Sequence, residues 1–166
     1  MAVRISRLGG FINDDTVNST PSVDCLFEAD AAISVGHGVM LDTAGNTSGR
    51  LVISATAALE HLLVGIYTGE GGTGSETTST NNQGGNDAVD GDPVWVRTYG
   101  PALGRYDTGG TDTLSDAGET MTIHTDAGEF ADMNPTESTV GLIPSVVLLE
   151  ATLADDALYW MFVRCM

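Results

Sequence analysis

The spacing of apolar residues is the strongest constraint on the fold, because it is that of β-strands almost throughout the chain. Short runs rich in β-branched and aromatic residues alternate with polar residues and are interrupted by Gly, Asp and Pro. Only residues 56–63, TAALEHLL, have the composition of a helix, which would be one or two turns long and lead into the strand LVGIY. Further strands are expected at residues 23–29, 38–42, 50–54, 93–99, 120–125, 145–152 and 157–164. This pattern predicts an all-β fold, a single compact β-sandwich or β-barrel domain.

Length and charge limit the partners of such a domain. The 166 residues are about enough for one domain, and no apolar run approaches the roughly 18 residues that cross a bilayer. The chain has 23 acidic residues, six arginines and no lysine, which gives a net charge of −17. A surface of this sign repels phosphate groups, so we expect neither nucleic acid nor a membrane as partner. The start of the chain lacks the apolar segment of a secretory signal, which favours synthesis in the cytoplasm.

Residues 69–87 contain the spacing G-x-G-x-x-G at Gly69, Gly71 and Gly74. Such glycines hold a phosphate when a helix opens behind them, but the polar stretch SETTSTNNQGG follows here, and there is no lysine for a Walker-type loop. The 19 residues comprise six Gly, six Ser or Thr, four Asn or Gln and three acids. A segment of this kind buries too little surface to offset its ordering entropy. It is therefore expected to be one long, flexible, exposed polar loop.

Candidate metal and catalytic motifs are weak. Asp87, Asp90 and Asp92 lie close together in the sequence, but their spacing is not that of a calcium-binding EF-hand loop, and Asp and Gly more commonly form turns. The chain contains neither G-x-S-x-G nor H-E-x-x-H. Among 23 acidic residues, some pair will lie by chance at the distance that separates the two catalytic carboxylates of a glycosidase. The number of acids is therefore no evidence for this activity. No catalytic residue, metal ligand or cofactor is assigned, and we expect no enzyme activity.

The histidines and cysteines show no shared pattern either. His37, His61 and His124 are scattered, and we expect structural or surface roles for them rather than catalysis. Cys25 and Cys165 lie near opposite ends of the chain, without a C-x-x-C pair. Two buried free thiols are the favoured interpretation, and a bridge closing the long loop is the alternative.

The N-terminal segment MAVRISRL alternates apolar and polar residues before Gly9 and Gly10. It indicates an extended arm or edge strand that can add itself to the sheet of a neighbouring protein. A frayed terminus or a strand of the chain's own sheet fits the pattern equally well. We divide the chain into an N-terminal arm and linker, residues 1–22, and a β domain, residues 23–166. The arm residues expected to bind a partner are Val3, Arg4, Ile5, Arg7 and Leu8.

The last expected strand, ALYWMFVR, is apolar on nearly both faces. Trp160 and Phe162 lie on one face, and Tyr159, Met161 and Val163 lie on the other. A strand of this type is buried on two sides. Trp160 and Phe162 are therefore expected in the core or at a seam between subunits.

Several segments resemble the small decoration, or cement, proteins on the heads of tailed bacteriophages. The similarity covers about residues 30–164 without the polar loop, and it lies in the segments AISVGHGVML, VDGDPVWVRTYG, VGLIP, VVLLEA and ALYWMFVR. Proteins of this kind are compact β folds that commonly form trimers over three-fold positions of the capsid and clamp neighbouring coat subunits. The resemblance implies a homotrimer on the capsid exterior of a virion, with the major capsid protein as partner and no catalysis. The insertion at residues 69–87 departs from the family pattern.

Three classes of function follow. The first is a virion structural protein that stabilises a phage head. The second is a surface-displayed adhesion or carbohydrate-binding β module, in which Trp95, Tyr99, Tyr106 and Trp160 would stack on sugars. The third is a small hydrolase, which the missing catalytic pattern disfavours.

Overall fold

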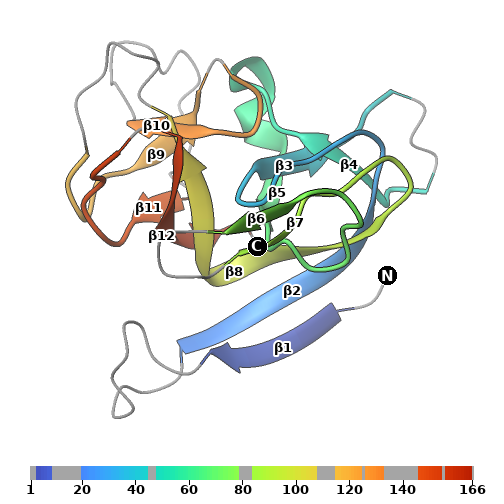
Figure 1. Ribbon diagram of the computed structural model, residues 1–166, viewed down its shortest axis with the longest axis horizontal. Helices are drawn as coiled ribbons and strands as arrows, with labels where there is room; N and C mark the ends of the chain where they lie inside the picture. Colours follow the sequence, from blue (N-terminus) through green and yellow to red (C-terminus); the bar gives the residue numbers. More distant parts are fainter. Residues whose placement is uncertain are drawn as a thin grey trace.

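The computed structural model describes residues 3–8, 20–44, 48–78, 84–107, 115–124, 126–132, 146–154 and 156–165. Figure 1 shows that strands make up nearly all of the regular structure, so the predicted all-β class is confirmed. The one helical segment is a 3-10 helix, η1 (Ala57–Leu62), where the sequence predicted a helix of one or two turns. The strands are β1 (Val3–Leu8), β2 (Thr20–Ala29), β3 (Gly38–Leu41), β4 (Leu51–Ser54), β5 (Leu63–Tyr67), β6 (Glu76–Thr78), β7 (Gly84–Asn86), β8 (Pro93–Tyr106), β9 (Met121–Ile123), β10 (Phe130–Asp132), β11 (Val146–Leu148) and β12 (Ala157–Arg164).

Five of these strands close into a small barrel, which we call the first ring. β2 pairs with β4 and with β8, and the pairs β4–β3, β3–β5 and β5–β8 complete the circuit. The β2–β4 pair is parallel, and the other four pairs are antiparallel. These strands supply most of one apolar cluster, which includes Phe27, Val39, Val52, Tyr67, Val94 and Val96.

A second ring shares the long strand β8. The C-terminal half of β8 pairs with β12 and touches β10, β10 pairs with β9, and β12 pairs with β11. A bridge between Thr120 and Val147 joins the start of β9 to β11 and closes this ring. The second apolar cluster includes Tyr106, Ile123, Phe130, Leu148, Met161 and Val163. In Figure 1, β8 is the yellow strand that links the two groups of strands.

Alternate residues of the first ring pack into different clusters. In β3, Val39 belongs to the first cluster and Met40 to the second; in β5, Tyr67 belongs to the first and Ile66 to the second. Successive side chains of a strand point to opposite faces. Both faces of these strands are therefore buried, which explains why their sequences are apolar without clear alternation.

The length of β8 differs from the prediction. The sequence indicated a strand that stops at Tyr99, because Gly100 and Pro101 are typical of a turn. In the structure the strand continues through them to Tyr106, and Pro101 pairs with Phe162 of β12. This continuation is what allows a single strand to belong to both rings.

The N-terminal segment takes the form of a strand in the chain's own sheet. β1 pairs antiparallel with β2 in a continuous register from Val3 opposite Cys25 to Leu8 opposite Thr20. Of the alternatives left open for the N-terminal segment, the structure has the strand of the chain's own sheet. β1 forms one end of the strand order and is the edge of the sheet.

The described part of the polar loop is folded against the first ring. Residues 76–78 and 84–86 form the β6–β7 hairpin, and the Tyr67 hydroxyl donates a hydrogen bond of 2.7 Å to the carbonyl of Asn86. Gly71 has φ +97°, and a Cβ there would lie 1.8 Å from the carbonyl oxygen of Pro93. The expectation of a loop without contacts to the body is wrong for these residues, because hydrogen bonds rather than apolar burial order them. Residues 79–83 lie outside the described residues.

A buried ion pair lies where β2 meets β8. The Asp24 side chain is 0% exposed and that of Arg97 is 7% exposed. Arg97 donates from Nε and Nη2 to the two carboxylate oxygens of Asp24, and from Nη1 to the carbonyl of Pro101. Such an arrangement satisfies both charges away from water. Cys25 beside it is buried and Cys165 is partly buried, and both are free thiols, which agrees with the favoured interpretation.

Candidate functional site

The predicted partner-binding residues Val3, Arg4, Ile5, Arg7 and Leu8 all belong to β1. The register of β1 on β2 alternates, so Arg4 lies opposite Asp24 and Ile5 opposite Val23. Their side chains lie outside the described residues. Because β1 is the edge of the sheet, its outer main chain has the position from which one more strand can be added.

Trp160 and Phe162 lie on β12, on the face turned away from the second apolar cluster. Both are half-buried, whereas Tyr159, Met161 and Val163 on the other face are buried. Trp160 is paired with Leu103 of β8, and Phe162 with Val147 of β11; these two partners are also half-buried. The half-buried residues therefore form an apolar outer face, which we call the β12 face: Tyr99, Leu103, Val147, Trp160 and Phe162. Phe162 also meets the ring of Tyr99 edge to face, at a centroid distance of 5.4 Å.

The aromatic residues considered for sugar stacking do not form a common platform. Tyr106 is 0% exposed, and its hydroxyl forms a hydrogen bond of 2.7 Å with the hydroxyl of Ser115. Its ring is therefore not accessible to a sugar. Trp95, Tyr99 and Trp160 are half-buried. Tyr106 is therefore removed from this set, since it is a core residue of the second ring.

Asp87 and Asp92 accept hydrogen bonds from the protein itself. The Asp92 carboxylate accepts from the N–H groups of Thr73 at 2.8 Å and Val89 at 2.9 Å, and these bonds lower its pKa. Asp87 accepts from the N–H of Val35 at 2.9 Å. The Asp92–Val89 bond lies within one turn, as expected for such an acid, whereas Asp87 ties the loop to a segment 52 residues away.

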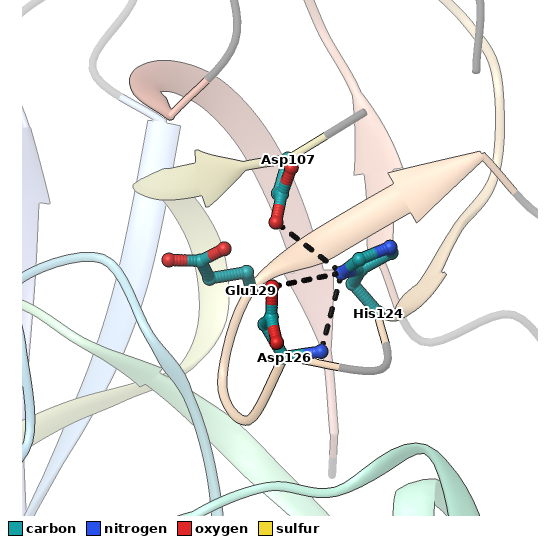
Figure 2. A group of neighbouring side chains, drawn as sticks. All are labelled: Asp107, His124, Asp126 and Glu129. Carbon is teal, nitrogen blue, oxygen red and sulfur yellow. Dashed lines mark hydrogen bonds and ion pairs between the residues drawn. The ribbon is translucent and has the colours of Figure 1, made fainter. Parts of the chain in front are cut away.

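Four side chains, one from the end of β8 and three from the turn between β9 and β10, meet at one end of the second ring, and we call them the 107/124 cluster. They are Asp107, His124, Asp126 and Glu129; Figure 2 shows Asp107 and Asp126 beside the His124 ring and the carboxylate of Glu129 directed away from it. One donor atom from each lies within 4.8 Å of the donors of the other three. His124 Nδ1 is 3.3 Å from Asp107 Oδ2 and 3.8 Å from Asp126 Oδ2, and it accepts the Asp126 N–H at 3.2 Å.

The positions of these four residues follow from the backbone. Asp107 directly follows β8, and its N–H donates to the carbonyl of Phe130 in β10. The other three residues belong to the turn between β9 and β10, where the N–H of His124 donates to the carbonyl of Glu129 at 2.8 Å. The parallel contact of Tyr106 with Phe130 thus places the end of β8 beside the turn.

This turn is fastened to the first ring through Gly128. The N–H of Gly128 donates to the carbonyl of Ala55, and its own carbonyl accepts from Gly38, both at 2.7 Å. Gly128 has φ +89°, and a Cβ there would lie 2.3 Å from Nδ1 of His37. Only glycine fits this conformation and this contact without strain.

The electrostatics of the cluster are dominated by burial. Burial, followed by the hydrogen bond and the charge of the neighbouring Asp107, raises the pKa of Glu129 to about 7. His37 lies on the other side of Glu129, with Nε2 at 3.8 Å from Oε1. Burial, followed by the charge of Arg105, lowers the pKa of His37 to about 4. At neutral pH the His37 ring is uncharged, so its contact with Glu129 is not an ion pair.

The sequence pattern does not predict this cluster. It indicates a structural or surface role for His124, because no catalytic or metal-binding motif includes this residue. The nearby spacing of His124, Asp126 and Glu129 was a weak signal for a turn rich in ligand atoms. Asp107 is supplied by a different strand, which only the pairing of β8 with β10 brings close.

No helix in the described residues is long and apolar enough to span a membrane. Comparison with known proteins found no matching family model and no matching curated protein. Among solved structures, the chain is similar to the head fiber gp8.5 N base of bacteriophage phi29, with 12% sequence identity and a TM-score of 0.47, over 87% of this chain and 95% of that chain.

Proposed function

We propose that this chain is a virion structural protein, a capsid decoration protein that binds the outer surface of a phage head and clamps neighbouring subunits of the major capsid protein. It acts by binding, as a homotrimer, without turnover. The observation that carries the proposal is β1, which is the edge strand of the described sheet and contains two arginines on a chain of net charge −17. The homotrimer follows from the sequence resemblance.

β1 suits this function because an edge strand can extend the sheet of another protein. Main-chain hydrogen bonds supply affinity in this mode, and the alternating side chains set the register. Arg4 and Arg7 add positive charge to this edge, whereas most of the chain is acidic. Charges of this kind act mainly on the rate and specificity of association.

The β12 face is the proposed contact between subunits. Trp160 and Phe162 are half-buried in the single chain, and aromatic residues are enriched in the cores of interfaces. We expect Trp160→Ala to shift the trimer toward monomer in light scattering coupled to size exclusion. The matched control is Leu153→Ala, because Leu153 is 81% exposed and lies outside β12. A trimer unaffected by Trp160→Ala would remove the β12 face as the seam.

The test of head binding is co-sedimentation with phage heads assembled without this protein. Arg4→Glu combined with Arg7→Glu retains the full length of β1 and is expected to reduce the bound fraction, most strongly at low salt, where screening is weakest. Deletion of residues 1–8 should abolish binding. The matched control is Arg50→Glu, compared with the single variants Arg4→Glu and Arg7→Glu, because it makes the same charge change at an exposed position outside β1 and the β12 face.

Each result has a distinct meaning. Equal losses in Arg50→Glu and in the single variants of Arg4 and Arg7 would show that overall charge, and not β1, governs binding. Full occupancy of heads by the truncated chain would eliminate β1 as the anchor. Failure of the intact protein to bind heads would overturn the proposed function, and the adhesion module would then be the leading alternative.

A further inference from the structure

We propose that the 107/124 cluster binds one divalent metal ion of the zinc class, as a structural site that ties the end of β8 to the β9–β10 turn. The four side chains offer one imidazole nitrogen and three carboxylate oxygens, all within 4.8 Å of one another. Four protein donors complete the coordination of a closed, structural zinc site. This inference is independent of head binding.

The distances are close to those that such an ion requires. Ligand atoms at about 2.0–2.1 Å from a tetrahedral metal are about 3.3 Å apart. His124 Nδ1 and Asp107 Oδ2 are 3.3 Å apart, and Asp126 Oδ2 is 3.8 Å from the same nitrogen. Asp126 is the exposed member of the group, with a side chain 75% exposed, so a small rotation of it is enough to close the site.

The chemistry of the donors selects the ion. His124 Nδ1 accepts the N–H of Asp126 at 3.2 Å, so an ion bound to this nitrogen would take the place of that hydrogen bond. Ca²⁺ takes six to eight oxygen ligands, and Mg²⁺ keeps an octahedral shell of oxygens. Imidazole together with carboxylates suits Zn²⁺ better than either ion, and Zn²⁺ binds such sites more tightly than Mn²⁺.

The surroundings hold the donors in place. Asp107 and His124 side chains are 12% and 14% exposed, and that of Glu129 is 16% exposed. The turn is fixed to the first ring by the two hydrogen bonds of Gly128. Arg105 donates through Nη1 to Asp156 at 2.5 Å, outside the cluster, and its charge opposes the rise in the pKa of Glu129. An ion would therefore enter a site in which Asp107, His124 and Glu129 are already largely buried and Asp126 completes the set.

The test is equilibrium dialysis and calorimetry of the full chain, treated with chelator and then titrated with Zn²⁺ alone at neutral pH. We expect one Zn²⁺ per chain, weaker binding of Mn²⁺ and no competition by an excess of Ca²⁺. Asp126→Asn and His124→Gln should each weaken Zn²⁺ binding by about tenfold or more. Asp90→Asn is the matched control, because it removes an exposed acid outside the cluster, and its affinity should equal that of the wild type.

Three results would overturn the inference. The first is the absence of stoichiometric Zn²⁺ binding, and the second is wild-type affinity in Asp126→Asn, a substitution at an exposed site that leaves the fold intact. The third is loss of binding in Cys165→Ser, which would assign the ion to a thiol. If Ca²⁺ bound with the same affinity as Zn²⁺, the proposal that the imidazole selects the ion would also be wrong.

Discussion

In the first ring, the carboxylate of Asp92 accepts hydrogen bonds from the backbone N–H groups of Thr73 and Val89, whereas in the second ring Glu129 faces the carboxyl group of Asp107. The same type of side chain therefore has a lowered pKa in one region and a raised pKa in the other. A carboxylate that accepts N–H donors, as Asp92 does, stabilises its loop. A carboxylate that faces other acceptors, as Glu129 does, either destabilises the fold or serves as a ligand for a cation.

The largest expected effect is on the stability of the fold, at Asp24, whose carboxylate pairs with the guanidinium of Arg97. Asp24→Ala leaves the buried guanidinium of Arg97 without its carboxylate, which should cost about 3–5 kcal/mol of unfolding free energy. Urea unfolding measures this change. Asp90→Ala, at an exposed turn, should leave the midpoint unchanged. A loss as small as that of the control would mean that water replaces the carboxylate, and the contrast between the two rings would then be weaker than proposed.

A smaller effect is expected at Asp87. Asp87→Ala removes the acceptor of the Val35 N–H, and a buried donor left unsatisfied costs about 1–3 kcal/mol. Asp87→Asn keeps an oxygen at this position and should recover most of the loss. Thermal unfolding of the two variants gives the comparison. Equal destabilisation by Ala and Asn would show that the charge, rather than the hydrogen bond, holds the polar loop on the first ring.

The smallest effect is a change in pH dependence at Glu129, measured on chelator-treated protein. Its pKa is about 7 in the folded state against a reference value of 4.5, so the folded state holds the proton more tightly. Between these two pH values the folded chain binds more protons than the unfolded chain, and stability falls as the pH rises. Glu129→Gln should therefore remove a decline in the urea midpoint between pH 5 and pH 8.

The buried His37 has the opposite sign and provides a check on this interpretation. Its folded pKa of about 4 lies below the reference value of 6.5, so its contribution is lost as the pH falls through that window. The difference between wild type and Glu129→Gln, taken at each pH, cancels the part of this contribution that does not depend on the contact between His37 and Glu129. A wild-type slope that persists in Glu129→Gln would show that another group titrates.

Much of the first ring could be predicted from the sequence, because its strands are local patterns. β3, β4 and β5 lie within a residue or two of the expected runs, and the short helix before β5 is present as η1. The contacts of the polar loop could not be predicted, because composition alone does not show that Tyr67 bonds to the loop or that Asp87 bonds to Val35. The second half of β8 was missed because Gly100 and Pro101 mimic a turn locally, and the pairing with β12 decides otherwise.

The sequence by itself determined the all-β class, the acidic surface and the apolar character of both faces of β12, because these follow from residue type and a period of two along the chain. Only the tertiary structure decided that β1 pairs with β2 and that β8 belongs to two rings. It alone decided that Asp107 meets His124. Contacts between residues far apart in the chain depend on strand register and closure, which no local pattern contains.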